Sequence, residues 1–273
     1  MENINKTGTV LFSIRGLKKV FPGVSSGGVN SGTDGFEALA GVDLDILEGE
    51  TTLIAGANGA GKTLLMKILA GLIEPGEGEI LYRGKPIKEC KNLPGASVGL
   101  VFQDPDTQII GETVEEDIRF GPENLKLGKE EIQARLEESL LALGLTHKRD
   151  FATRHLSGGE KRRLATAGVL AMGCDTIIMD EPFANLDWPG VVQVLKIIGD
   201  LKKAKKTVIL LTHELEKVLA FADRLVILEG GKVRDSGEIE EVLDRLKSEW
   251  GVRDPRRVYK SAEDCTWLEA NNK

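Results

Sequence analysis

Short, mostly apolar runs alternate with segments of helical periodicity over most of this chain. Four to six such residues bounded by turn residues are typical of strands that are buried on both faces. The runs with this character are residues 51–55, 98–102, 176–180, 207–212 and 225–228. Apolar positions recur with helical spacing in residues 64–70, 112–119, 129–143, 158–172, 190–204, 214–222 and 238–248. This alternation predicts right-handed βαβ units and a mostly parallel sheet.

Two parts of the chain depart from the alternation. Residues 10–21 and 37–47 are predicted strands, and 79–85 is a third strand that ends in a turn. The segment 22–35 between the first two is rich in Gly, Ser, Thr and Asn, so we expect a long mobile loop there. From residue 103 to 172 the predicted elements are all helices, which indicates a helical insertion in a strand-rich core.

The composition fits a soluble globular protein with one large core, or one core and a subdomain. The chain has 273 residues, of which 41% are hydrophobic and 29% charged. Its net charge of −7 argues against a nucleic-acid surface, because phosphate binding needs a basic patch. Cys90, Cys174 and Cys265 show neither metal-ligand nor disulfide spacing, which fits a reducing cytosol. No apolar run approaches the roughly 18 residues that span a bilayer, and the N-terminus lacks a signal-peptide pattern, so we expect any membrane role to come through a partner.

The strand at 51–55 and the helix at 64–70 flank the candidate chemistry of the chain. The segment between them fits the P-loop pattern G-x-x-x-x-G-K-[ST], and reads Gly56-Ala57-Asn58-Gly59-Ala60-Gly61-Lys62-Thr63. Its glycines let the backbone curl into a nest of N–H groups around a phosphate, at the positive end of a helix. Lys62 adds a charge near the β- and γ-phosphates, and the Thr63 hydroxyl can ligate Mg²⁺. The sequence therefore predicts binding of a nucleoside triphosphate.

The predicted strand 176–180 ends in two acids, Asp180 and Glu181. The carboxyl ends of parallel strands line the ligand crevice of such a sheet. There, Asp180 can hold Mg²⁺ directly or through water, and Glu181 can polarise the attacking water as a general base. Without the P-loop, two solvated acids that cap a strand would be the simpler interpretation.

A second candidate anion site precedes this strand, in Leu156-Ser157-Gly158-Gly159-Glu160. Ser157 and the two glycines open a predicted helix, which offers unhindered N–H groups, a hydroxyl and a helix N-terminus. An ordinary helix N-cap is the alternative interpretation. The segment resembles the signature motif of the ATP-binding cassette (ABC) ATPases. The P-loop, Gln103, Asp180-Glu181 and His213 stand in the same order as in that family, and the resemblance covers residues 8 to about 248.

The resemblance implies the ABC ATPase fold. This fold is an α/β P-loop NTPase core with a mostly parallel sheet, an antiparallel edge subdomain and an inserted helical subdomain. The expected cassette is residues 1–248, with its core at 8–102 and 173–248, its insertion at about 103–172, and a tail of unassigned role at 249–273. In the family two cassettes pair head to tail, and each signature segment contacts the γ-phosphate that the other P-loop holds.

The resemblance also implies roles for single residues. His213 is expected to sense the γ-phosphate and to orient the water together with Glu181. Gln103 is expected to ligate Mg²⁺ and to move with a transmembrane partner, and Asp187 belongs to the loop that crosses to the partner cassette. Phe21 is the candidate for the aromatic that stacks on adenine, although it can equally be an edge-strand core residue.

Two positions differ from the common family pattern. Leu64 stands where many cassettes have a second hydroxyl residue, which removes one possible α-phosphate contact. Lys161 follows Glu160 where Gln is frequent. Neither change removes a group that the chemistry needs, so we expect an active ATP site.

Residues 101–122 are similar to one subgroup, the ATPase subunits of energy-coupling-factor importers of cobalt, nickel, biotin and other vitamins. Their Q-x-P-[DE]-x-Q stretch appears here as Gln103, Pro105, Asp106 and Gln108. Pro105 and Asp106 suit the start of a short helix directly after Gln103. Such a helix can relay the nucleotide state to a docked membrane helix; ordinary packing of the insertion is the alternative.

The sequence therefore predicts an ATP hydrolase with Mg²⁺ as cofactor that powers import of a metal ion or vitamin. We expect it to lie peripherally at the cytoplasmic face of the cell membrane. Its expected partners are a second ABC subunit, in a homodimer or a heterodimer, and integral membrane transport subunits, with no nucleic acid. The ATPase of a conventional ABC transporter is the nearer alternative. A soluble ABC ATPase of DNA repair or chromosome maintenance is the more distant one.

Overall fold

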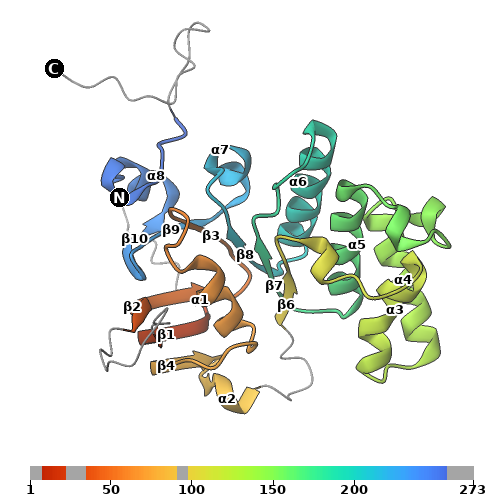
Figure 1. Cartoon of the computed structure of the whole chain (residues 1–273), viewed down its shortest axis with the longest axis horizontal. Coiled ribbons are helices and arrows are strands. Elements are labelled where there is room, and N and C mark those ends of the chain that lie inside the picture. Colours follow the sequence, from red (N-terminus) through yellow and green to blue (C-terminus); the bar gives the residue numbers. More distant parts are fainter. Residues whose placement is uncertain (1–7, 23–34, 91–97, 257–273) are drawn as a thin grey trace, which may run out of the picture.

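The computed structural model describes residues 8–22, 35–90 and 98–256. In Figure 1 a central sheet stands between an antiparallel sheet on one side and a group of helices on the other. Most of the loop predicted at 22–35, and the tail beyond residue 256, lie outside the described residues.

The central sheet has six strands in the order β10-β9-β3-β8-β7-β6. Their bounds are Val98–Val101 for β6, Thr51–Ala55 for β3, Thr176–Asp180 for β7, Thr207–Leu211 for β8, Arg224–Glu229 for β9 and Lys232–Glu238 for β10. All neighbours from β9 to β6 pair in parallel, which confirms the predicted parallel sheet. Only β10 is antiparallel, in a hairpin with β9. It was not predicted, because its sequence KVRDSGE has a single apolar residue and no face of it is buried.

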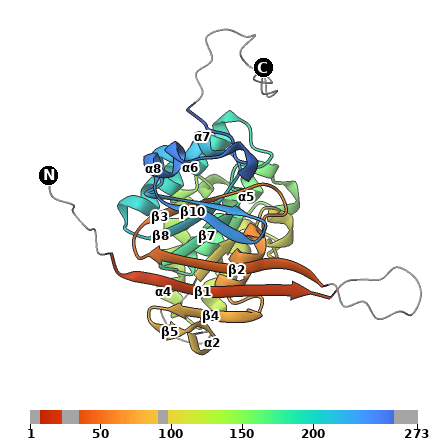
Figure 2. The same ribbon diagram turned by 90° about the vertical axis from the view of Figure 1, so that its left-hand side faces the viewer.

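A second, antiparallel sheet has the order β2-β1-β4-β5. It consists of β1 (Val10–Phe21), β2 (Phe36–Leu47), β4 (Glu77–Tyr82) and β5 (Lys85–Pro86). Figure 2 shows β1 and β2 as two long neighbouring strands across the front of the molecule. The single strand predicted at 79–85 is thus a hairpin, since the chain reverses at Arg83 and Gly84, which both have positive φ. The antiparallel edge sheet expected from the family resemblance is present.

The core follows from the alternation of side chains along the parallel strands, which point to opposite faces of the sheet. One face, with residues such as Ile54 and Ile209, packs on helix α1 (Lys62–Leu69) and on the antiparallel sheet. The other face, with residues such as Leu53 and Leu210, packs on the helices that follow β6 and β7. Each fully buried aliphatic side chain contributes about 1.5–3 kcal/mol. The parallel strands are therefore covered on both faces, which explains why they are mostly apolar.

The predicted helical insertion is seen as α3 (Val114–Asn124), α4 (Lys129–Ala142) and α5 (Gly158–Ala171), which lie together beyond β6 (Figure 1). A reciprocal cap between Thr113 and Glu116 starts α3. On α4, the apolar positions predicted from the sequence are buried, with Leu136 and Leu140 fully so. These helices also pack on the sheet core and do not form a core of their own.

After the insertion come α6 (Trp188–Lys203), α7 (Leu215–Val218) and α8 (Ile239–Asp244). A short helix, α2 (Ile87–Cys90), follows β5. One predicted helix differs in type and another in length. The helix predicted at 214–222 is one α-helical turn followed by a 3₁₀ turn, and the helix predicted at 238–248 ends at Asp244. The second ends early because the chain turns back to pack Trp250 and Val252 on the core. Within the described ranges, each helix is too short or too polar to cross a bilayer.

Adjacent leucines on α4 test how the insertion is held. Leu140 is 0% exposed and Leu141 is 77% exposed. Leu140→Ala should lower the free energy of unfolding by about 2–4 kcal/mol, because it removes buried methyl groups and leaves a cavity. Leu141→Ala, the matched control, should change it by less than about 0.5 kcal/mol. Urea unfolding followed by circular dichroism measures both, and equal effects would contradict the described packing of α4.

Candidate functional site

The carboxyl ends of four parallel strands open onto one cavity of about 490 Å³ between the central sheet and the ends of β1 and β2. It is lined by eleven of the residues predicted from the sequence: Phe21, Asn58, Gly59, Gly61, Lys62, Thr63, Leu64, Gln103, Asp180, Glu181 and His213. Strands β3, β6, β7 and β8 each deliver part of this set, because parallel strands end at the same edge of a sheet.

The loop after β3 has the backbone shape that its glycines permit. Gly59 and Gly61 have φ values of 82° and 99°, in the region that side chains disfavour. At position 56 a glycine is needed for lack of space, because a Cβ there would lie 2.1 Å from the carbonyl oxygen of Leu228. The loop therefore presses against the end of β9, and α1 begins directly after Gly61.

Lys62 is buried at the centre of this loop, with 7% of its surface exposed. Its ammonium group donates hydrogen bonds to the carbonyl oxygens of Gly56 at 2.7 Å and Ala57 at 3.2 Å. Burial lowers the pKa of Lys62, and the carboxylates of Glu181 and Asp180 oppose this effect. A buried cation that is paired mainly with neutral carbonyls is well prepared to receive an anion.

Thr63 and Asp180 form a polar pair across the loop. The Thr63 hydroxyl donates to Oδ2 of Asp180 at 2.9 Å. Burial raises the pKa of Asp180, the hydrogen bond from Thr63 opposes this, and the neighbouring Glu181 charge adds to the increase. With the exposed amide of Gln103 on the same cavity, these groups offer the oxygen ligands that Mg²⁺ prefers.

Glu181 and His213 form a second polar pair on the cavity. Oε1 of Glu181 lies 3.0 Å from Nδ1 of His213. Oε2 of the same carboxylate is buried and has no hydrogen-bond partner among the described residues. The backbone of Glu181 has a φ of 45°, an unfavourable value for a residue with a side chain. One oxygen of this carboxylate is thus held by the histidine, and the other has no partner that would compete for a proton.

Two aromatic rings stand at the mouth of the cavity. Phe21 and Phe36 are the last pair of the β1–β2 ladder, and 41% and 65% of their surfaces are exposed. Phe36 was missed by sequence reasoning because it lies across the long loop from Phe21. The pairing of residues 10–21 with 37–47 as a hairpin is the signal that would have found it. Either ring can stack on a nucleobase.

Five predicted residues do not line this cavity: Gly56, Ser157, Gly158, Gly159 and Asp187. Ser157 caps α5, its hydroxyl accepts from the N–H of Glu160, and the Glu160 carboxylate accepts from the N–H of Ser157. Asp187 caps α6 without such a reciprocal bond, since its carboxylate accepts from the N–H of Gly190 alone. The N-cap interpretation of Ser157 thus describes its contacts within this chain, and both helix starts are exposed to solvent.

The stretch that carries the subgroup resemblance is fixed to the sheet at both ends. As predicted, Pro105 begins a short helical turn (Pro105–Thr107, of 3₁₀ type). Gln108 then returns to β6, where its amide accepts from the N–H of Phe102 at 3.1 Å and donates to the carbonyl of Leu100 at 3.1 Å. The turn is therefore a small rigid unit between Gln103 and α3.

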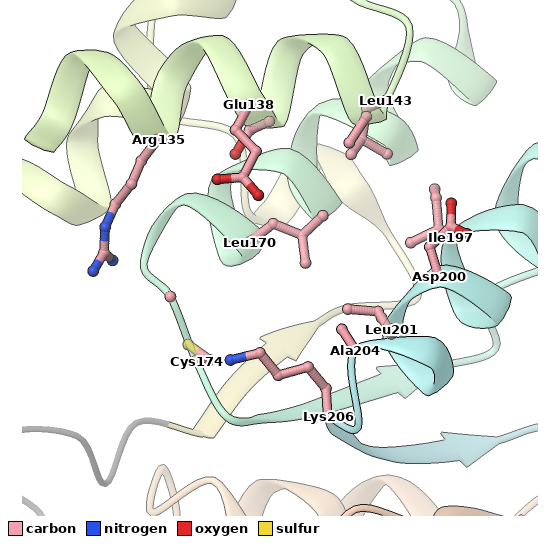
Figure 3. Close-up of a pocket in the computed structure, with 13 residues that line it drawn as sticks. Arg135, Glu138, Leu143, Leu170, Cys174, Ile197, Asp200, Leu201, Ala204 and Lys206 are labelled. Atoms are coloured by element: carbon pink, nitrogen blue, oxygen red, sulfur yellow. The ribbon is translucent and has the colours of Figure 1, made fainter.

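A second cavity, of about 470 Å³, lies on the other side of the helical insertion (Figure 3). It opens between α4, the end of α5 and the last turns of α6, where Leu170, Leu201 and Ala204 face one another and Arg135 and Lys206 lie at the rim. None of the residues predicted for the site lines it. This cavity separates part of the helical insertion from α6 of the core.

A P-loop at the carboxyl end of β3, on the same cavity as an Asp-Glu pair at the end of β7, with β8 between the two strands, is typical of a P-loop nucleoside triphosphatase. Comparison with known families narrows this class. A family described as "ABC transporter" matches residues 39–184, from β2 to the loop after β7. The chain belongs to this family of ABC transporter ATP-binding proteins.

Several curated relatives are similar over most of the chain. The energy-coupling factor transporter ATP-binding protein EcfA of Methanocaldococcus jannaschii is 41% identical over 218 residues, which are 79% of this chain and 78% of the relative. The EcfA protein of Methanoculleus marisnigri is 42% identical over 210 residues, 76% of each chain.

Solved structures show the same fold. The cbiO1 protein of Clostridium perfringens, part of the ABC transporter complex cbiONQ, superposes with a TM-score of 0.72 at 34% identity and covers 86% of this chain and 91% of its own. The ATP-binding cassette MJ0796, in a dimeric post-hydrolysis state with ADP and Pi, has a TM-score of 0.69 at 25% identity, over 83% of this chain and 98% of its own. The α/β ABC ATPase fold expected from the sequence is confirmed.

The position of Phe36 generates a test of the base site. Phe36→Ala should weaken ATP affinity roughly threefold to tenfold, the loss expected for one aromatic stacking contact. Phe151→Ala removes an exposed ring on the helical insertion and should leave the affinity unchanged. Titration with a fluorescent ATP analogue measures both. Unchanged affinity in the Phe36 variant, with a loss in Phe21→Ala, would assign the stacking to Phe21 alone.

The cap of α5 generates a pH prediction. The hydrogen bond from Lys148, at 2.6 Å, outweighs burial and lowers the pKa of Glu160 from 4.5 to about 2. The unfolded chain therefore binds this proton first as the pH falls, so the stabilisation by Glu160 is complete above about pH 4.5 and is lost towards about pH 2.

Glu160→Gln should remove this part of the pH dependence. Urea titrations at about pH 5 and about pH 3 should show a smaller loss of unfolding free energy between the two pH values in the variant than in the wild type. Glu138→Gln, which changes an exposed glutamate on α4, is the control and should behave as the wild type. Equal losses in wild type and Glu160→Gln would contradict the described ion pair.

Proposed function

We propose that this protein is the ATP-hydrolysing subunit of an importer of the energy-coupling-factor type. The observation that carries the hydrolytic part is the carboxylate of Glu181, oriented by His213 and with a buried free oxygen on the cavity that the P-loop closes. The similarity of this chain to the EcfA proteins and to cbiO1 supports the role in transport. The DNA-repair alternative has no comparable support, because these relatives are named as transporter components.

The residues of the cavity divide the work of hydrolysis between them. The N–H groups of the P-loop and the ammonium of Lys62 bind the β- and γ-phosphates and balance their charge. Oε2 of Glu181 accepts a proton from the attacking water, while Oε1 stays on His213. The bond from the water oxygen to the γ-phosphorus forms as the bond to the β-phosphate oxygen breaks, which gives ADP and phosphate.

Mg²⁺ is the second cofactor of this proposal. The Thr63 hydroxyl, Asp180 and the Gln103 amide are oxygen donors on the same cavity and fit its preference. When bound, the ion supplies positive charge next to the transferred phosphoryl group. Burial raises the pKa of Asp180, which means that it disfavours the charged carboxylate. A cation bound at that position would stabilise the charged form.

A second cassette completes the site in this proposal. Ser157 and Asp187 lie outside the cavity of their own chain and are exposed to solvent, although the family resemblance gives both a role at a nucleotide. A head-to-tail partner would bring its own copies of these groups to the cavity. The dimeric state of MJ0796 with ADP and Pi supports this arrangement.

The remaining partner is an integral membrane subunit. The described part of the helical insertion exposes large apolar side chains to solvent, which are Ile110, Phe120, Leu125, Leu141 and Phe151. Exposed apolar residues on one part of a molecule indicate a protein contact. The membrane subunit is therefore expected to dock on this insertion, next to Gln103, and the ATPase to lie peripherally at the cytoplasmic face.

Glu181→Gln tests the catalytic assignment. It should lower the rate of ATP hydrolysis by about 10²- to 10⁴-fold, the contribution of a general base, with ATP affinity retained. The variant should also accumulate as an ATP-bound dimer in size-exclusion chromatography. Lys62→Ala is the contrasting variant, which should lose ATP affinity instead. A Glu181→Gln rate within a few-fold of wild type would remove Glu181 as the base.

The same variant identifies the partners. A tagged Glu181→Gln protein, purified from detergent-solubilised native membranes, should recover a multi-span membrane protein and a second cassette chain or a second copy. Recovery of soluble or DNA-bound partners alone would contradict the importer assignment and leave the ATPase assignment intact.

A further inference from the structure

Arg162, on the second turn of α5, places a buried guanidinium group behind the site. Only 3% of this residue is exposed. Nη1 donates to the carbonyl oxygen of Glu181 at 2.9 Å, and Nη2 donates to the carbonyl oxygen of Gln103 at 2.6 Å. The planar fork of one arginine thus joins the segments that follow β6 and β7, where the candidate metal ligand and the candidate base begin.

This contact falls on the most strained peptide group of the site. Glu181 has a φ of 45°, and such a conformation persists only where the surroundings hold it. Its N–H donates to the carbonyl of Leu211 at 2.8 Å, and its carbonyl accepts from Arg162 and from the N–H of Ala184. Arg162 is the side chain among these restraints, since the other two are backbone groups of the neighbouring strand and turn.

The buried guanidinium of Arg162 lowers the stability of the fold. No carboxylate of the described residues lies within ion-pair distance of Arg162, so the charge is satisfied by neutral carbonyl oxygens. Burial lowers the pKa of Arg162, and the more distant charges of Asp104 and Glu181 oppose this only in part. A buried cation without a close counter-ion is unfavourable for folding. The position of this guanidinium therefore indicates a role in the site rather than in stability.

We propose that Arg162 is a positioning residue of ATP hydrolysis, which fixes the peptide groups of Gln103 and Glu181 so that their side chains keep one geometry towards the γ-phosphate. The proposal rests on the function proposed above, in which both side chains act on bound ATP. It goes beyond that function because Arg162 itself does not line the nucleotide cavity.

The same residue ties the site to α5. Arg162 is five positions from the Ser157 cap, roughly 7 Å along the helix. The far end of α5, at Leu170, borders the second cavity (Figure 3), whereas Arg162 near the start of the helix is buried. A partner that shifts α5 through the exposed Ser157 end therefore displaces Gln103 and Glu181 together.

Substitutions of Arg162 test the proposal in the full chain. Arg162→Met keeps most of the volume and removes both hydrogen bonds, and Arg162→Lys keeps the charge without the planar fork. Arg163→Gln is the matched control, because the Arg163 guanidinium donates to the carbonyl of Leu143 and forms no hydrogen bond or ion pair with a site residue in the described part of the chain. Measurements are the kcat and KM of ATP hydrolysis, the Kd of a fluorescent ATP analogue, and the melting temperature.

The expected result is a split between binding and turnover. Arg162→Met should lower kcat by roughly 10- to 100-fold, as expected for a displaced catalytic group, with Kd within about twofold of wild type. Arg162→Lys should recover part of the loss, and Arg163→Gln should match the wild type. Hydrogen exchange should become faster in peptides that cover residues 103–108 and 181–185, and not in the P-loop.

Two results would overturn the proposal. One is an unchanged kcat in a folded Arg162→Met or Arg162→Lys protein. The other is a lower kcat together with weaker ATP binding and a lower melting temperature. This is the pattern of a purely structural residue. If Arg162→Met does not fold, Arg162→Lys alone decides by the same criteria. A wild-type protein that binds no ATP would contradict the proposed function instead.

Discussion

The parallel hydrogen-bond register of β3, β8, β7 and β6 is the constraint on which the site depends. Leu53 pairs with Leu210, and Leu210 with Met179, so the strands end at one level. The backbone that leaves each strand there carries a different chemical group: the P-loop, His213, the Asp180-Glu181 pair and Gln103. A shift of one residue in any pair would turn the buried side chains to the wrong face and move one group away from the others. The apolar cores on both faces of the sheet therefore maintain the geometry of a polar site.

Most of this arrangement could be predicted from the sequence because its signals are local. The five parallel strands are short apolar runs, and the P-loop is set by glycines at fixed spacing. The failures depend on tertiary contacts. The strand β10 pairs only because β9 is beside it, and α8 ends early because Trp250 returns to the core. Phe36 joins the site through the strand register, and Arg162 resembles a solvated residue of a charged helix until its burial is known.

The site stores unfavourable free energy that the rest of the fold offsets. Lys62 and Arg162 are buried cations, and burial lowers the pKa of each. Glu181 adds a left-handed backbone, at an expected cost of about 1–3 kcal/mol. A bound phosphate would relieve part of this, since it would add negative charge next to Lys62, whose burial the carboxylates of Glu181 and Asp180 offset only in part. This is the usual relation between stability and activity, in which groups prepared for a ligand destabilise the protein without it.

The strand order also has a consequence for how the protein is made on the ribosome. Strand β3 emerges early, yet its two neighbours in the sheet are β8 and β9, and β8 begins only at Thr207. Nascent chains grow by about 5–20 residues per second, so β3 waits roughly ten to thirty seconds for the first of these neighbours. During this time an apolar strand, fully buried in the finished protein, has both edges open to pairing with other chains. The P-loop that follows β3 gains the support of β8 and β9 only late in synthesis, so a ligand of this loop can stabilise the finished cassette but not the growing chain.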